Sequence, residues 1–143
     1  MPKMIFINLP VTDLAASTAF YEGLGATKNL QFSDENTSCI VFSDTIYAML
    51  LTHQRFADFT KRKIIDAHTS VQALFALSAD SRAEVDDLVA KASRAGGKPD
   101  PNPQQDYGFM YGRSFQDPDG NIWEAFWMDP AAVNAPPETA DAA

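Results

Sequence analysis

Cysteine and positive charge are scarce in this sequence, and each shortage removes a class of function. Cys39 is the only cysteine among 143 residues, so the chain can form neither an internal disulfide nor a cysteine-based metal cluster. Lys and Arg number 11 against 19 Asp and Glu. The resulting net charge of -8 disfavours nucleic acids and anionic membrane surfaces as partners.

Long apolar runs are missing as well. Asn8 and Pro10 interrupt the apolar stretch near the start, which is therefore too short for a membrane span or for the core of a signal peptide. We expect a cytoplasmic protein in a reducing compartment. The hydrophobic content of 45% is sufficient for one domain, or for two half-domains that share a core.

The first third of the chain is predicted to form a strand, a helix and three further strands. The apolar run over residues 4–11 is followed by Asp13, a residue type that favours helix N-caps. Apolar residues at helical spacing predict a helix from there to Gly25, because glycine is typical of a helix C-terminus. Three β-prone stretches separated by polar turns predict antiparallel strands over residues 28–32, 38–42 and 45–52.

The same order of elements returns in the second half. A strand is expected over residues 71–79, then a helix capped by Asp80-Ser81, with Asp80 as the counterpart of Asp13, and then strands around residues 109–115 and 122–127. We predict an α+β fold in which two βαβββ modules form an open, curled sheet around a central cleft. The expected boundaries are residues 1–52 and 71–129 for the modules, 53–70 for a connecting segment and 130–143 for a disordered, Ala- and Pro-rich tail.

The connecting segment over residues 53–70 allows two interpretations. Four apolar residues in it are spaced for a short amphipathic helix, so it is either a linker packed by its own side chains or a lid over a pocket. His53 and His68 lie in this segment, and each is either solvated or a lid residue that reaches the pocket.

Glu124 is the one ionisable side chain in an otherwise apolar strand that follows the turn Asp117-Pro118-Asp119-Gly120. A carboxylate removed from water is costly unless it is paired, bound to metal or protonated. If the hairpin is bulged, Ser114 lies opposite Glu124 and Arg113 points to the outer face; if it is tight, Arg113 moves inward beside Glu124. Glu124 is therefore either a buried acid bonded to Ser114 or Asn8, or a catalytic general acid or base.

Two motifs at opposite ends of the repeat carry a family resemblance. The pattern V-T-D-L-x-x-S-x-x-F-Y-x-x-L-G over residues 11–25 and D-P-D-G-N-x-x-E over residues 117–124 resemble the vicinal oxygen chelate superfamily. That superfamily includes glyoxalase I, extradiol dioxygenases, fosfomycin-resistance thiol transferases and bleomycin-binding resistance proteins. The resemblance implies the glyoxalase/bleomycin resistance/dioxygenase fold, a homodimer, and in the enzymes a divalent metal (Fe, Mn, Ni, Zn or Mg) bound in the cleft.

The family's metal ligands are largely absent from the matching positions. Glu124 matches the final ligand, whereas the other three positions fall on Phe6, Leu50 and Leu74, which cannot bind a metal. One carboxylate alone cannot hold Zn or Fe, because such sites use about three protein ligands. No cofactor is therefore expected unless the alignment of the motifs is wrong.

A cleft lined by the inward-facing residues suits a small, partly hydrophobic molecule. Its expected ligand-binding residues are Phe6, Asn8, Leu50, Leu74, Met110, Ser114 and Phe126. Two functions remain open. The first is metal-free binding or sequestration of a small molecule, as in bleomycin resistance proteins. The second is a metal-dependent enzyme that uses Glu124, namely a glyoxalase-type lyase, an extradiol dioxygenase or a thiol transferase.

Overall fold

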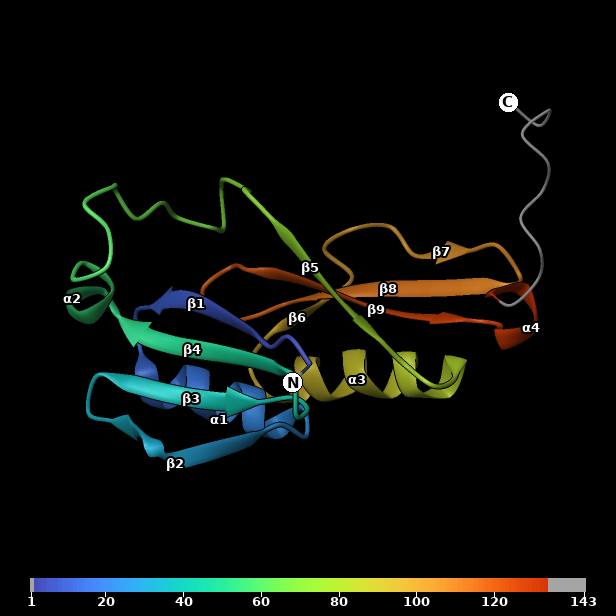
Figure 1. Cartoon of the computed structure of the whole chain (residues 1–143). Helices are drawn as coiled ribbons and strands as arrows, with labels where there is room; N and C mark the ends of the chain where they lie inside the picture. The colour runs from blue at the N-terminus through green and yellow to red at the C-terminus, as the bar shows by residue number, and fades with distance from the viewer. Residues whose placement is uncertain (1, 134–143) are drawn as a thin grey trace, which may run out of the picture.

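The computed structural model describes residues 2–133 and contains two β-sheets with the two long helices on one side (Figure 1). The first half comprises β1 (Ile5–Val11), α1 (Leu14–Gly23), β2 (Thr27–Asp34), β3 (Thr37–Val41) and β4 (Ile46–Thr52). The second half comprises α2 (His53–Phe56), β5 (Leu74–Ser78), α3 (Arg82–Arg94), β6 (Lys98–Pro99), β7 (Gln105–Asp106), β8 (Met110–Gln116), β9 (Ile122–Met128) and α4 (Pro130–Val133).

Each half forms its own sheet. The four-stranded sheet has the order β1-β4-β3-β2, and the five-stranded sheet has the order β5-β9-β8-β6, with β7 paired to β8. In both sheets the strand before the helix pairs in parallel with the last strand of the half, and the remaining pairs are antiparallel. The predicted α+β fold with two open βαβββ sheets is therefore confirmed.

Side-chain caps fix the start of both long helices. The Asp13 carboxylate accepts a hydrogen bond from Ala16 N at 3.0 Å, as the sequence predicted. The second helix differs by one residue from the prediction, because Ser81 rather than Asp80 is the N-cap and accepts from Glu84 N. Asp80 instead donates its backbone N–H to the Glu84 carboxylate at 2.5 Å, in a variant of the capping box.

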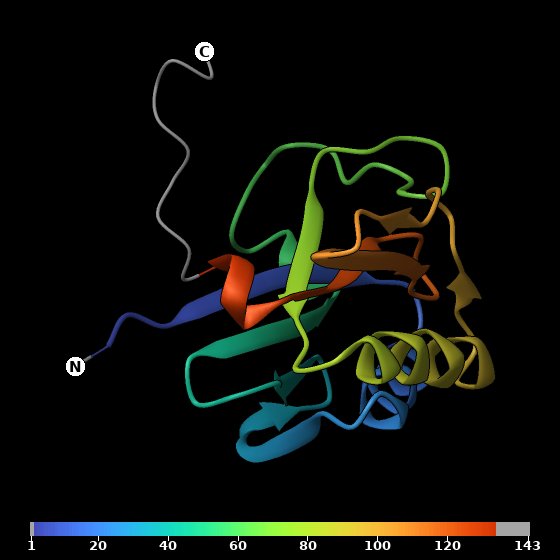
Figure 2. The ribbon, with the colours of Figure 1, turned by 90° about the vertical axis from the view of Figure 1, so that its right-hand side faces the viewer.

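The two halves share one hydrophobic core on the helix side of the sheets. Phe20 and Tyr21 of α1 are fully buried there together with Phe115 of β8 and Trp123 of β9. The Tyr21 ring meets the Trp123 ring edge-on, with 5.9 Å between their centroids. Figures 1 and 2 show α1 and α3 side by side beneath the sheets. Since neither half buries its apolar surface alone, they form a single folded body.

The turn at residues 117–120 connects the halves through buried polar groups. Asp117, 1% exposed, accepts hydrogen bonds from its own turn and from the Tyr21 hydroxyl at 2.5 Å. That hydroxyl also accepts from Trp123 Nε1 at 3.0 Å. Burial and the Asp117 carboxylate raise the pKa of the Tyr21 phenol well above its ordinary value, so it stays protonated and donates to Asp117.

Little regular structure forms between β4 and β5. The predicted amphipathic helix is reduced to the single turn α2, after which the chain runs through turns and bends to residue 73. In Figures 1 and 2 this segment arches over the side of the sheets opposite to α1 and α3. Among residues 2–133, no helix has the length and hydrophobicity needed to cross a membrane. Of the predicted tail, residues 134–143 lie outside the described part of the chain.

Candidate functional site

The helix-free face of the five-stranded sheet brings together most of the predicted cleft residues of the second half. Ser114 lies opposite Glu124 in the β8–β9 pairing, which is the register predicted for a bulged hairpin. Because side chains alternate along a strand, this register places Met110 and Phe126 on the same face as Glu124. Arg113 points to the helix side, where it pairs with Asp86 and Asp100.

A hollow of about 220 Å³ opens beside Glu124. Its walls are Pro103, Gln105, Met110, Gly112, Arg113, Ser114, Glu124, Ala125 and Phe126. The Glu124 carboxylate accepts no hydrogen bond and forms no ion pair with any other residue in the range 2–133. The proposed bond from Ser114 is absent, because the Ser114 hydroxyl instead donates to the Asn102 carbonyl at 3.3 Å, while it accepts from Asn102 N at 3.0 Å. Glu124 is thus the one charged side chain of this wall that a ligand can pair with.

Ion pairs hold the loop that closes one side of this hollow. Arg113 binds the Asp100 carboxylate through two nitrogens, at 2.6 and 3.0 Å, and thereby lowers the pKa of Asp100. Arg82 binds Asp106 in the same two-point manner, and the pKa of Asp106 falls to about 2. The loop contributes Pro103 and Gln105 to the hollow. Sequence reasoning missed this wall, because nothing local in a Pro/Gln-rich loop indicates which surface it covers.

The four-stranded sheet agrees with the prediction at two positions and differs at a third. Phe6 and Asn8 lie on the helix-free face, and the Phe6 ring, 49% exposed, stacks on Tyr47 at 4.6 Å. Leu50 does not line a cleft: it is 0% exposed and packs in the core against α1. In the parallel pairing Asn8 faces Met49, so Met49 occupies the face that was predicted for Leu50.

A second, larger hollow of about 540 Å³ lies between β1, α2, the segment over residues 63–73 and the turn over residues 119–122. Asn8 lines it, and so do both histidines, His53 and His68. Phe6 and Leu74 belong to neither hollow. Leu74 is 48% exposed on the helix-free face of β5, at the edge of its sheet. The predicted cleft is therefore divided between two separate hollows within one chain.

The residues present do not fit the divalent metal that the family's enzymes use. No group of three or more His, Cys, Asp or Glu side chains is close enough together to hold a metal ion within residues 2–133. Glu124 has Ala76 and Ser114 as its neighbours across the two adjoining strands. The side chains of Phe6, Leu50 and Leu74, at the other three matching positions, have no atom that can bind a metal. The donor set is thus a single carboxylate.

Comparisons with known proteins agree with this architecture. The family model described as Glyoxalase/Bleomycin resistance protein/Dioxygenase superfamily matches residues 3–125. A hypothetical protein from S. aureus is 24% identical, with 89% of this chain and 94% of that chain covered and a TM-score of 0.73. A glyoxalase/bleomycin resistance protein/dioxygenase family enzyme from Burkholderia phytofirmans is 19% identical, with 89% and 99% covered and a TM-score of 0.71.

More distant neighbours share the fold as well. A genomically encoded fosfomycin resistance protein from Listeria monocytogenes is 16% identical, with 100% of this chain and 99% of that chain covered and a TM-score of 0.63. No curated protein matches the sequence. At these identities the structural neighbours establish the fold alone. Because the family model matches most of the chain, this protein belongs to the glyoxalase/bleomycin resistance protein/dioxygenase superfamily.

Proposed function

We propose that this protein binds a small, partly hydrophobic molecule in the hollow beside Glu124, without a metal, in the manner of a binding or sequestering protein. The observation that carries the proposal is the Glu124 carboxylate, which has no partner among residues 2–133 and lies in a wall whose apolar side chains are those of Pro103, Met110 and Phe126. A carboxylate in apolar surroundings binds well to a group that donates hydrogen bonds or carries positive charge.

The shape and charge of the wall define the ligand class. The apolar side chains suit a ring or a short hydrocarbon body, and the carboxylate suits an amine or hydroxyl at its end. The overall net charge of -8 also favours cationic over anionic ligands at long range. We therefore expect an aromatic or aliphatic amine, or an amino-bearing natural product of which it is a part.

The binding unit proposed here is a homodimer. Phe6 and Leu74 are each about half exposed on helix-free faces, and β1 and β5 are edge strands with one unpaired side. A second copy that covers these edges would remove both side chains from water and would complete the hollow as a cleft between two chains. Analytical ultracentrifugation should give twice the chain mass, and Phe6→Glu should shift the protein toward monomer.

The ligand proposal is tested with three probes of one shape and different charge. Benzylamine, benzyl alcohol and benzoate are titrated by calorimetry against the purified protein. Benzylamine should bind most tightly and benzoate least. Glu124→Gln should reduce benzylamine affinity by about tenfold, the usual loss for one charge-assisted hydrogen bond.

Glu22→Gln is the matched control, because Glu22 is an exposed residue of α1 and lines neither hollow. It removes the same charge and should leave benzylamine binding unchanged. Equal affinity of the three probes, or equal losses in the two variants, would overturn the proposal. Elemental analysis decides the metal-dependent alternative: one equivalent of a divalent metal per chain, lost in Glu124→Gln, would replace metal-free binding with chelate chemistry.

A further inference from the structure

The larger hollow is formed by segments that are far apart in the sequence. The end of β1 and the turn over residues 119–122 form its floor, and α2 and the segment over residues 63–73 form its sides and roof. Its volume of about 540 Å³ is more than twice that of the hollow beside Glu124. Its apolar lining comprises Leu9, Pro10, Phe56, Ile64, Ile65, Ala67, Val71, Ala73, Phe75 and Ile122.

The roof of this hollow is fixed against the floor. Gly120 approaches it so closely that a Cβ atom there would lie 2.5 Å from His68 N and 2.7 Å from the Ala67 carbonyl carbon. Asp66 closes a tight turn in the roof, since one of its oxygens accepts from His68 N at 2.9 Å and also contacts His68 Nδ1 at 3.0 Å. The cavity therefore has a defined wall even though the segment contains little regular structure.

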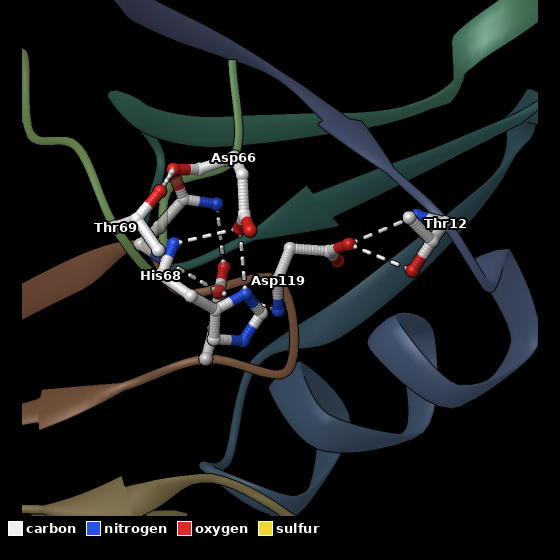
Figure 3. Close-up of polar contacts among 7 residues, drawn as sticks. Thr12, Asp66, His68, Thr69 and Asp119 are labelled. Carbon is white, nitrogen blue, oxygen red and sulfur yellow. Dashed lines mark hydrogen bonds and ion pairs between the residues drawn. The ribbon is translucent and has the colours of Figure 1, made fainter. Parts of the chain in front are cut away.

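The acidic side chains at the hollow are already engaged by the protein. Asp119 accepts hydrogen bonds from the backbone N–H and hydroxyl of Thr12, at 2.9 and 3.0 Å, and from the Ser17 hydroxyl at 3.0 Å (Figure 3). Asp66 is turned toward His68 in the same view. Neutral donors therefore occupy most of the lone pairs of Asp119, and one oxygen of Asp66 is shared with His68, while both side chains keep their charge.

Basic side chains are concentrated in the segment that forms the roof, and the one that lines the hollow has no ion pair within residues 2–133. Residues 53–68 contain four Lys and Arg but only two Asp, within a chain whose net charge is -8. Arg55 is paired with Asp58 at 2.8 Å, whereas Lys63, which lines the hollow, forms no ion pair with any other side chain in the range 2–133. Within residues 2–133, the hollow thus offers an ammonium group that has no ion pair and the side-chain amides of Asn8 and Gln72, which form no hydrogen bond, beside its apolar lining.

From this arrangement we infer that the larger hollow is a second binding site, specific for a small carboxylate with an apolar body. Lys63 supplies the charge that pairs with the carboxylate, and Phe56 and Phe75 supply the contact for the hydrocarbon part. The site goes beyond the function proposed for the hollow beside Glu124, because it requires different residues and a ligand of opposite charge. One protein would then bind an amine and a carboxylate at separate places.

Phenylbutyrate, phenylbutanol and phenylbutylamine test this site, since they share one apolar body and differ in the end group. Calorimetry should show tighter binding of phenylbutyrate than of the alcohol or the amine. Backbone amide NMR shifts on adding phenylbutyrate should concentrate in residues 63–73 and 119–122. Lys63→Met, which keeps most of the length of the side chain, should weaken phenylbutyrate binding about tenfold and leave phenylbutanol binding nearly unchanged.

Lys61→Met is the matched control, because Lys61 lies two residues away in the same segment and does not line the hollow. It should leave phenylbutyrate affinity within about twofold of the original protein, since only screened long-range charge is lost. Glu124→Gln should also leave phenylbutyrate affinity unchanged, so this inference and the proposed function can fail independently. Equal losses in the two lysine variants, or shifts confined to the wall around Glu124, would overturn the second site.

Discussion

Replacing Tyr21 with Phe removes one oxygen atom from the fully buried contact between the two halves. That oxygen donates to Asp117 at 2.5 Å and accepts from Trp123 Nε1 at 3.0 Å, and all three residues are at most 1% exposed. Loss of the bond to a carboxylate costs about 1.5–3 kcal/mol, and leaving a buried indole N–H unpaired costs about 1–3 kcal/mol. We expect Tyr21→Phe to lower the free energy of unfolding by about 3–4 kcal/mol.

The assay is urea unfolding at neutral pH, followed by tryptophan fluorescence and circular dichroism. Tyr47→Phe is the control, because it removes a hydroxyl that makes one exposed hydrogen bond, to the Asp44 carbonyl at 3.0 Å. That variant should lose less than about 1 kcal/mol. A loss below about 1 kcal/mol in Tyr21→Phe, equal to that of the control, would refute the view that this hydroxyl joins the two halves.

Two further predictions concern the turn and the loop beside the first hollow. Gly120→Ala should destabilise the protein by about 1–3 kcal/mol, because Gly120 has a φ of +96° and the added Cβ meets the backbone of Ala67 and His68. Amide hydrogen exchange at His68 and Thr69 should become faster, because the segment over residues 63–73 has to move away. Unchanged exchange at these residues would contradict the close contact. The pKa of Asp106 is lowered to about 2 from an ordinary value of 3.8, chiefly by its hydrogen bond from Arg82, so its contribution to stability is present above about pH 4 and is lost as the pH falls toward 2. The gap in urea midpoint between the original protein and Asp106→Asn should therefore narrow from pH 5 to pH 2, and a gap that does not change with pH would count against the ion pair.

Local signals in the sequence were sufficient for most of the architecture. The N-cap at Asp13 was predictable because it depends on residues a few positions away. The sequence left two registers open for the hairpin, and the structure has the one that places Ser114 opposite Glu124. Leu50 was assigned to the wrong face because β4 is apolar on both sides over Ala48, Met49, Leu50 and Leu51, so alternation carries no information about which side is buried.

The site was harder to predict because it depends on long-range placement. One interpretation of Glu124 was a bond from Ser114 or Asn8, but the loop brings the Asn102 backbone to Ser114, and the Ser114 hydroxyl bonds to it instead. The link from Tyr21 to Asp117 was missed, although a tyrosine on the apolar face of a helix is a signal that a polar partner is needed in the core. The second hollow is formed by a segment without periodicity, so its pairing with the turn at Gly120 has no local signature.

The position of Tyr21 also has a consequence for synthesis of the chain. Its partners, Asp117 and Trp123, are separated from it by 96 and 102 residues, and the Thr12–Asp119 bonds span 107 residues. While the chain grows on the ribosome, the first half emerges early with a phenol hydroxyl that has no buried partner and a core that lacks one wall. Folding is therefore expected to wait until β9 has been synthesised rather than to proceed half by half, because β9 and the turn before it provide the buried partners that α1 requires.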